Sequence, residues 1–292
     1  MDSMTLQACL FDGCLGPAQG PRICGNSFAD IRACPSCGMQ RIDPPRSQDQ
    51  LDALHSDPAY FNHPYFTARR TLDDSKRLES YRFIIHELFP EGVPEGARLL
   101  DVGCDTGAFL DVARKDFGMS VAGVEISHTS AEIAKAKGFD VYLGSIMDIE
   151  IPEKFDAIVL NDVIEHVAHP DRLVEILASL LKPGGRLFIS TPNGDAFIYT
   201  IGQWLFKLAG RIKLLDKLYL PYHEWYFPTK ALADLVKQKG LKVASHRPVE
   251  FPLSEFGHGI ILKIIMAHIF IIQKILHRPS VQFLIAQKQV TS

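Results

Sequence analysis

A glycine-bearing turn and a carboxylate further along the chain are the first residues whose types and spacing could do chemistry. Gly103 and Gly107 lie between an apolar strand and an apolar-faced helix. Glycine lacks a Cβ, so the backbone can bend sharply there and its N–H groups can approach a nucleotide-like ligand. Glu125 ends the next apolar stretch, Val121–Glu125. In a doubly wound fold, a carboxylate at this place can accept two hydrogen bonds from a ribose.

Four of the six cysteines have a spacing that suits a metal better than disulfides. One pair forms a Cys-x-x-Cys knuckle, and an earlier pair could complete a tetrahedral zinc site. The predicted ligands are Cys9, Cys14, Cys34 and Cys37. Cys24 is a spare thiol that could replace one of the first pair, and unliganded thiols in a loose arm are the alternative. So short a segment buries little apolar area, and a metal would supply folding free energy.

The elements that must position these residues alternate between strands and helices, as in a doubly wound α/β fold. The sequence predicts a seven-stranded, mostly parallel sheet whose last strand is antiparallel. The expected strands are Leu99–Val102, Val121–Glu125, Phe139–Leu143, Phe155–Asn161, Arg186–Ser190, Leu241–His246 and Ser280–Ala286. Helical spacing over Leu72–Phe89 predicts a helix before the first strand.

At this point the sequence resembles the class I S-adenosylmethionine-dependent methyltransferases. The motifs that carry the resemblance are Asp101–Gly107, Glu125, Asp148-Ile149, Phe155-Asp156 with Glu165-His166-Val167, and Leu181–Gly185. The resemblance covers roughly residues 78–250. Ser190–Asn193 and Glu165-His166 are most similar to the small-molecule branch that includes the ubiquinone-biosynthesis O-methyltransferases.

The resemblance implies S-adenosylmethionine as cofactor and a role for each matching residue. Gly103, Cys104, Asp105 and Gly107 would surround its methionine part and Glu125 its ribose, while Asp148 with Ile149 would lie at the adenine and Asn161 below the sulfonium. Asp101 and Ile126 complete the predicted cofactor-binding set. Asp105 departs from the family, which usually has glycine there. Asp tolerates positive φ, so the turn can form, and its carboxylate could pair with the amino group or sulfonium but would repel the carboxylate of the cofactor.

The resemblance also implies a histidine over the active site, and His223 is the first candidate for the general base. An imidazole with its ordinary pKa near 6.5 can accept a hydroxyl proton near neutral pH. His166 is the competing candidate because it follows the fourth strand, where side chains line the crevice. Asp162, Glu165 and His166 resemble the Glu-x-x-Glu-His arrangement that binds a divalent ion in the ubiquinone methyltransferases, with Asp in place of the first Glu. The structural alternative is that Asp162 and Glu165 lie at a helix N-terminus, where the helix dipole favours carboxylates.

Two inserts interrupt the expected domain. Residues 194–228 are predicted to form a helical lid whose basic residues alternate with apolar ones. The basic side could rest on an anionic membrane surface, and a solvated face is the alternative. Residues 256–278 form an apolar helical insert in which Lys263, Gln273, Lys274 and His277 fall on one side. The remaining apolar face could cover a substrate, form a homodimer seam or lie in a bilayer surface.

Composition narrows the function classes. The chain has 292 residues with a net charge of −3, which gives no basic footprint for nucleic acid. The start of the sequence shows no charged-then-apolar signal, so we expect a cytoplasmic protein that could also lie at the inner face of a membrane. Between Arg41 and Pro64 the richness in Pro, Asp and Gln predicts a linker. The expected domains are a zinc-ribbon-like segment at 1–45, a linker with N-terminal helices at 46–95, and the cofactor-binding domain at 96–292.

The sequence therefore predicts a methyltransferase that moves a methyl group by in-line displacement to a small, hydrophobic acceptor, with O-methylation first by family analogy. N- and C-methylation stay open. The alternative is a non-catalytic binding module that contacts a partner through the zinc ribbon. A nicotinamide dehydrogenase would need Gly-x-Gly-x-x-Gly, and Asp105 stands where the second glycine belongs.

Overall fold

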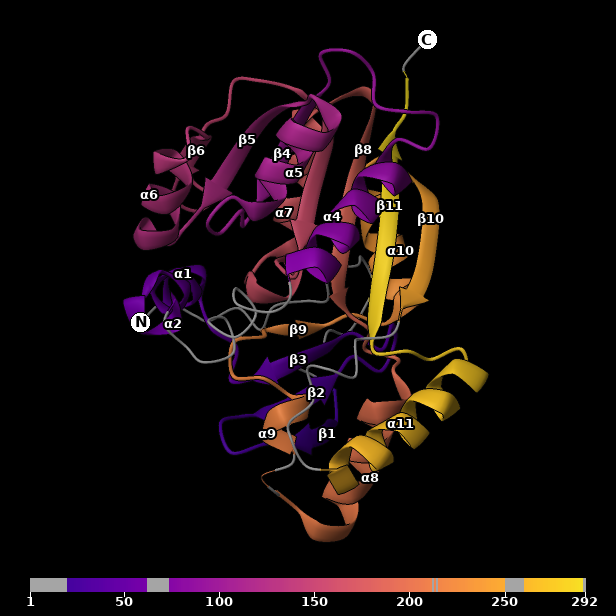
Figure 1. Ribbon diagram of the computed structural model, residues 1–292. Helices are drawn as coiled ribbons and strands as arrows, with labels where there is room; N and C mark the ends of the chain where they lie inside the picture. Colours follow the sequence, from indigo (N-terminus) through magenta and orange to yellow (C-terminus); the bar gives the residue numbers. More distant parts are fainter. Residues whose placement is uncertain (1–19, 62–73, 212, 214, 250–259, 291–292) are drawn as a thin grey trace.

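The computed structural model describes residues 20–61, 74–211, 213, 215–249 and 260–290 (Figure 1). Its main sheet has seven strands in the order β10-β11-β8-β7-β4-β5-β6. The strands are β4 (Arg98–Val102), β5 (Ser120–Glu125), β6 (Asp140–Leu143), β7 (Phe155–Asn161), β8 (Leu181–Pro192), β10 (Leu241–Val249) and β11 (Val281–Lys288). Only β11 runs antiparallel to its neighbours in this sheet, β10 and β8. The predicted doubly wound fold is confirmed.

Helices cover both faces of this sheet because its central strands are apolar on both sides. Along β7, Ile158 and Leu160 pack with α7 (Pro170–Leu180) and α10 (Thr229–Gln238). Ala157 and Val159 face the other way and pack with three helices. These are α4 (Asp74–Leu88), α5 (Ala108–Phe117) and α6 (His128–Ala136). The helix expected before the first strand is therefore present as α4.

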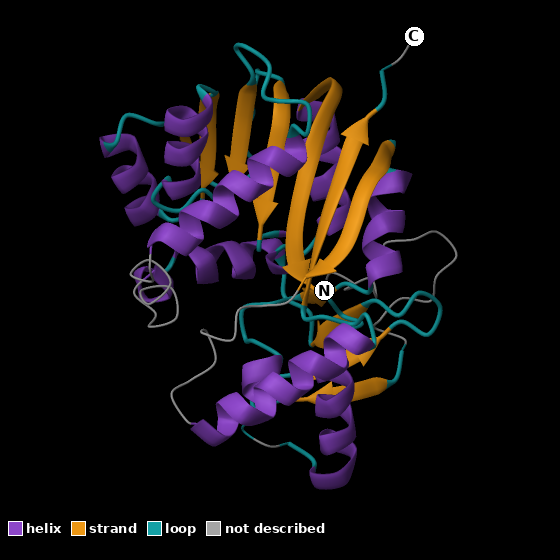
Figure 2. Ribbon diagram, turned by 45° about the vertical axis from the view of Figure 1, so that its right-hand side comes forward, coloured by secondary structure: helices purple, strands orange, loops and turns teal. Residues whose placement is uncertain are grey.

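A second, antiparallel sheet combines segments that are far apart in the chain. Its order is β1-β2-β3-β9, with β1 (Arg22–Gly25), β2 (Asp30–Ala33) and β3 (Gln40–Asp43) from the N-terminal segment and β9 (Trp225–Tyr226) from the 194–228 insert. In Figures 1 and 2 this sheet lies below the carboxyl ends of the parallel strands. The insert forms helices as predicted, α8 (Phe197–Ala209) and α9 (Leu215–Leu218). It also supplies the strand that joins it to the N-terminal segment.

A buried ion group fastens this joint. The Glu224 carboxylate is fully buried and accepts from Arg41 Nε at 2.9 Å and Arg46 Nε at 3.2 Å. The backbone N–H of Arg46 also donates to Glu224 at 3.1 Å. The guanidinium of Arg41 lies over the Trp225 ring, 4.5 Å from its centroid. Burial raises the pKa of the Glu224 carboxyl, and the two guanidinium groups offset part of that rise.

The predicted zinc site is only partly within the described residues. Cys9 and Cys14 lie outside them. Cys34 and Cys37 lie in the β2–β3 turn, where Gly38 N donates to Cys34 O at 2.9 Å, and neither is in a disulfide. Cys24 is buried in β1. The four-cysteine site and the domain boundary at residue 45 stay predictions.

The linker predicted between Arg41 and Pro64 is wrong for much of its length. It contains α1 (Gln48–Ser56) and α2 (Pro58–Phe61). Ser47 and Gln50 form a capping box in which Ser47 Oγ accepts from Gln50 N and Gln50 Oε1 accepts from Ser47 N. This reciprocal pair stabilises a helix start that the polar composition concealed.

The apolar insert forms α11 (Ile260–Ile275), which packs beside α8. The expected polar side is wrong at one position: Gln273 is fully buried, and its Oε1 accepts from Ile198 N at 3.3 Å. The side-chain amide of Gln273 also donates to Ser280 Oγ at 3.1 Å, so its oxygen and its nitrogen both have partners inside the protein. No helix among the described residues combines the length and apolar character needed to cross a membrane.

Candidate functional site

The glycine-bearing turn and Glu125 meet at the carboxyl ends of β4 and β5. Gly103 N and Cys104 N donate to Val124 O at 2.8 and 3.1 Å. Asp105 N donates to Glu125 Oε2 at 2.8 Å, while Ser127 N donates to Oε1 at 2.8 Å. Both carboxylate oxygens are therefore held by the backbone. Each keeps further lone-pair capacity for a ligand hydroxyl.

The glycines of the turn are required by protein neighbours as well as by their backbone angles. Gly103 and Gly107 both have φ of +79°. A Cβ on Gly103 would lie 2.8 Å from Val163 Cγ2, and one on Gly107 would lie 2.8 Å from the Phe139 ring. Other protein side chains thus occupy the space that a side chain would need at these two positions. The sequence interpretation had linked the glycines to the approach of a ligand instead. The Val163 contact also places the loop after β7 directly against the turn.

A third glycine, Gly123, to which the sequence motif gives no role, makes room for the turn. A Cβ on Gly123 would lie 2.5 Å from Cys104 Sγ. Cys104 is buried under the turn, and burial raises the pKa of its thiol far above its ordinary value. It is therefore a neutral packing residue here, because only a thiolate is an effective nucleophile or metal ligand.

Three carboxyl groups converge on the turn. Asp105 adopts a positive φ of 45° and its Oδ1 accepts from Ser130 Oγ at 2.8 Å. Burial, with repulsion from Asp105, raises the pKa of Glu125 to about 7. Burial, with repulsion from Glu125 and Asp105, raises the pKa of Asp101 to about 8. A site that concentrates acidic groups favours a cationic ligand. A cofactor that carries a sulfonium and an ammonium group therefore fits these residues.

The remaining residues of the predicted cofactor set border the same edge of the sheet. Gly144 N donates to Glu125 O at 2.9 Å and brings the 144–149 loop beside the end of β5. In this loop Ile149 is half-buried and Asp148 is exposed. Ile126 follows Glu125 directly, and Asn161 is half-buried at the end of β7. The structure thus places the turn, Glu125, Ile126 and Asn161 at the carboxyl ends of β4, β5 and β7, with the 144–149 loop after β6 beside them, while the role of each residue stays a prediction.

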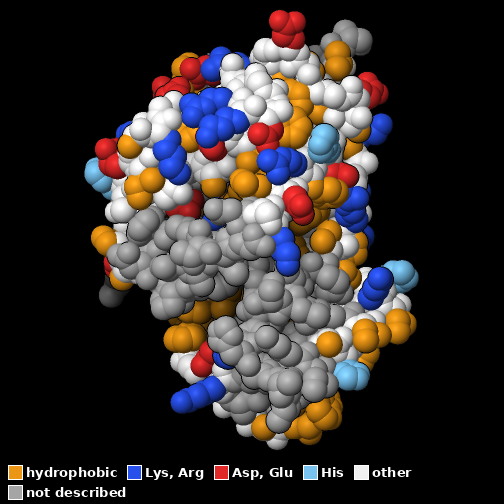
Figure 3. Space-filling model, in the orientation of Figure 1, with side chains coloured by type: hydrophobic (Ala, Val, Ile, Leu, Met, Phe, Trp, Pro, Cys, Tyr) orange, Lys and Arg blue, Asp and Glu red, His pale blue; other side chains and the backbone are white. Residues whose placement is uncertain are grey.

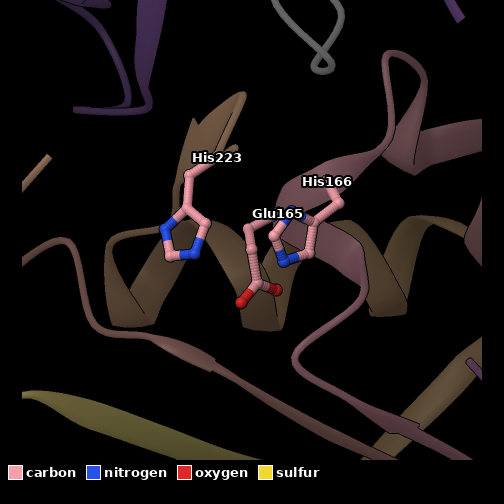
Figure 4. A group of neighbouring side chains, drawn as sticks. All are labelled: Glu165, His166 and His223. Carbon is pink, nitrogen blue, oxygen red and sulfur yellow. The ribbon is translucent and has the colours of Figure 1, made fainter. Parts of the chain in front are cut away.

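A second group of side chains meets at the loop after β7. Glu165 and His166 come from a short 3₁₀ helix, Ile164–His166, and His223 precedes β9. Each offers one ligand atom, and these three atoms lie within 4.8 Å of one another. Figure 4 shows the Glu165 carboxylate between the two imidazole rings. A carboxylate with two imidazoles is a donor set that divalent transition metals accept.

The hydrogen bonds of this group leave nitrogen atoms available. Glu165 is fully buried, and its Oε2 accepts from Thr191 Oγ1 at 2.9 Å. His166 Nδ1 lies 2.9 Å from the Tyr222 carbonyl oxygen. Because a carbonyl can only accept, Nδ1 carries the proton and Nε2 keeps a lone pair. His223 Nδ1 is buried and has no hydrogen-bond partner among the described residues. Burial lowers the pKa of both imidazoles, so both rings are neutral near pH 7.

Asp162, the third residue of the predicted divalent-cation set, faces a different partner. Its Oδ1 accepts from Ser190 Oγ at 3.2 Å, and its φ is +58°. Among the residues that the structure describes, the cluster of close ligand atoms contains His223 in its place. The chain order hid this because His223 lies in the insert, far from Glu165 in sequence.

His55 is the nearby residue that sequence reasoning missed. It comes from α1, and its ring meets His166 edge-on with centroids 4.8 Å apart. His166 in turn meets His223 at 4.8 Å. Gln48, also on α1, accepts from Ala168 N at 3.0 Å and holds the helix against this loop. The capping box at Ser47 is the sequence signal that could have indicated this helix.

Comparison with known proteins agrees with this geometry. Residues 74–246 match a family model described as a methyltransferase domain. A ubiquinone biosynthesis O-methyltransferase of Coxiella burnetii is 37% identical over 125 residues, which are 39% of this chain and 53% of that protein. One of Xylella fastidiosa is 34% identical over 157 residues, 50% of this chain and 61% of that protein. The chain thus spans little more than half the length of the curated relatives it matches.

Solved structures share the fold at low identity. A SAM-dependent methyltransferase of Archaeoglobus fulgidus gives a TM-score of 0.55 at 19% identity, covering 77% of this chain and 100% of that one. Phosphoethanolamine N-methyltransferase 2 of Haemonchus contortus, in complex with S-adenosyl-L-methionine, gives 0.56 at 16% identity, covering 86% and 62%. With the family match over more than half of the chain, these findings assign it to the class I S-adenosylmethionine-dependent methyltransferases.

Proposed function

We propose that this protein transfers the methyl group of S-adenosylmethionine to a hydroxyl of a small, apolar acceptor. The observation that carries the proposal is the contact between Gly103 and Val163. It brings the loop after β7, which also carries Glu165 and His166, against the turn that would hold the cofactor. The relatives named O-methyltransferases support the choice of oxygen as acceptor atom.

The chain's own residues would bind and orient the cofactor, whose sulfonium supplies an already activated methyl group. The Glu125 carboxylate, fixed by two backbone N–H groups, would accept from the ribose hydroxyls. The acidic cluster around Asp105 would attract the cationic groups. The second sheet, clamped by Glu224, would exclude water from the reacting atoms.

Proton removal from the acceptor hydroxyl would fall to a neutral imidazole. His166 Nε2 has a lone pair because Nδ1 donates to Tyr222 O, and His223 Nδ1 has no hydrogen-bond partner among the described residues and would accept a proton in the tautomer protonated at Nε2. A base of lowered pKa is weak, so the acceptor oxygen would itself have to be acidified. Glu165, His166 and His223 could hold a divalent cation that lowers the pKa of a bound hydroxyl.

The aromatic surroundings favour an apolar acceptor. Tyr226 lies with its ring centroid 5.6 Å from that of His223, and Tyr199 lies 5.4 Å from Tyr226. Both tyrosines are buried, and burial raises the pKa of each phenol, so both stay neutral. Their neutral rings would offer an acceptor apolar surface on this side of the site.

The test is a product screen with labelled S-adenosylmethionine against lipid-like phenols, carboxylates and sugars. The protein is first stripped with a chelator and then assayed with Mg²⁺, Mn²⁺ or Zn²⁺. We expect label in a phenol ether, and a loss of kcat of about a hundredfold or more in Glu165→Gln with cofactor affinity unchanged. Glu132→Gln, which neutralises an exposed carboxylate on α6, is the matched control. Cofactor binding without transfer to any acceptor would instead favour the non-catalytic module.

A further inference from the structure

An exposed apolar surface lies at the end of the molecule away from the cofactor turn. The side chains that form it come from two packed helices and are 41% to 70% exposed. They are Trp204 and Leu208 of α8, Ile271, Ile272 and Ile275 of α11, and Leu276 directly after α11. We call this surface the α8–α11 face. Figure 3 shows hydrophobic side chains over α11 at the lower right, with basic and histidine side chains among them. Groups of exposed large apolar side chains often mark a surface that binds a partner or a membrane.

The orientation of the C-terminal end of α11 is fixed by a buried glutamine. Gln273 is fully buried and bonds to Ile198 N and to Ser280 Oγ. Since Ile271, Ile272 and Ile275 lie around it on the same helix, the amide points inward and the apolar side chains point to solvent. The C-terminal end of α11 is thus held with these three isoleucines exposed. Gln273 therefore fixes which side of the helix a partner would meet.

The charge of the two segments identifies the partner. Residues 196–215 and 257–281 contain no Asp or Glu, in a chain of 34 acidic residues. Their basic residues are Lys207, Arg211, Lys213, Lys263, Lys274 and Arg278. Lys207, Lys213 and Lys274 are exposed, whereas Arg211 pairs with Asp30. A second copy of this face would bring these like charges together. An apolar surface with a basic border instead matches an anionic lipid surface.

We propose that the α8–α11 face docks on the surface of a membrane that contains anionic lipid, with its apolar side chains in the headgroup boundary and its lysines among the headgroups. The proposal does not depend on methyl transfer. α8 lies within the residues 74–246 that match the family model, and α11 lies beyond them. Tyr199 of α8 contacts Tyr226, which contacts His223. Docking would therefore place the membrane behind the aromatic cluster of the candidate site.

The test uses the intrinsic fluorescence of the full chain. It has two tryptophans: Trp204 is 59% exposed and Trp225 is 1% exposed. With vesicles of phosphatidylcholine and phosphatidylglycerol we expect a blue shift from Trp204 together with co-sedimentation. Vesicles of phosphatidylcholine alone should bind much more weakly, and raised salt should weaken binding to the anionic ones. Trp204→Phe should remove the shift while most of the protein still sediments.

Variants at exposed positions separate docking from folding. Leu208→Asp with Ile275→Asp should lower the partition coefficient on the order of a hundredfold, and Lys207→Gln with Lys274→Gln about tenfold. Val290→Asp, at a 71% exposed position after β11, is the matched control and should bind like wild type. Equal binding to neutral vesicles, or no binding at all, overturns the proposal. So does a wild-type dimer in sedimentation that the double Asp variant converts to monomer, since a second copy would then cover the face.

Discussion

Replacing Glu125 with Gln tests the central feature of the cofactor site. Each Glu125 oxygen accepts a backbone N–H at 2.8 Å, from Asp105 and from Ser127. The amide of Gln has only one acceptor oxygen, so one of these N–H groups would face an NH₂ donor. The variant also loses the charge that would bind the ribose hydroxyls. Charge-assisted hydrogen bonds contribute about 1.5–3 kcal/mol each, so we expect the Kd for S-adenosylmethionine to rise about tenfold to a hundredfold.

The same substitution has a pH signature whose sign follows from the raised pKa. Burial raises the pKa of Glu125 to about 7, so the group is mostly protonated at pH 6 and mostly ionised at pH 8. If the ionised form binds the cofactor, wild-type affinity should rise about tenfold from pH 6 to pH 8. The affinity of Glu125→Gln should change much less. The difference between the two proteins should therefore be largest at alkaline pH.

Isothermal titration calorimetry at pH 6, 7 and 8, in buffers of different ionisation enthalpy, measures both the affinity and the protons released. Glu132→Gln, which removes a surface carboxylate paired with Lys135, should bind like wild type. Wild-type affinity in Glu125→Gln at pH 8 would refute the ribose assignment. If Glu125→Gln binds the cofactor weakly but the wild-type affinity does not change with pH, only the argument from the raised pKa of Glu125 is refuted.

Three further predictions concern stability. Asp101 has a pKa raised to about 8 by burial, so its contribution to stability is lost as pH rises through that value; the ligand-free Asp101→Asn variant should therefore lose less thermal stability between pH 6 and pH 9 than wild type in calorimetry. Glu224→Gln leaves Arg41 without its charged partner and should lower the free energy of unfolding in urea by about 3–5 kcal/mol, and a change below about 1 kcal/mol would contradict the clamp. Gly123→Ala places a Cβ 2.5 Å from Cys104 Sγ and should lower stability by about 1–3 kcal/mol, with partial recovery when Cys104→Ala is added, because Cys104 Cβ and Leu110 Cδ1 stay 3.0 and 3.1 Å from the new Cβ; a double variant less stable than Gly123→Ala would contradict the clash with the sulfur.

The main sheet could be predicted because its signals are local. Val121–Glu125 and Phe155–Asn161 are apolar runs that end in polar residues, and they became β5 and β7 with nearly the same bounds. Parallel strands buried on both faces have this continuous pattern whatever surrounds them. The glycines of the turn were also found, although part of their reason is contact with protein side chains.

The second sheet and the second half of the site could not be predicted because they depend on distant contacts. β9 is two residues long and has no periodicity of its own. His55 and His223 reach His166 from segments on either side of it in the chain, and no spacing rule joins them. The inward position of Gln273 likewise depends on Ile198 and Ser280, which a helical wheel of α11 does not contain.

The partnership of Arg41 with Glu224 spans 183 residues, which affects how the chain folds during synthesis. At roughly 5–20 residues per second, a ribosome needs about 9–37 seconds to make that stretch. During that time β3 has no β9 to pair with, and the side chains of Arg41 and Arg46 are solvated by water. Closure of that sheet is therefore a late event of high contact order, and a chain cut short before Trp225 would expose the edge of β3 to other chains.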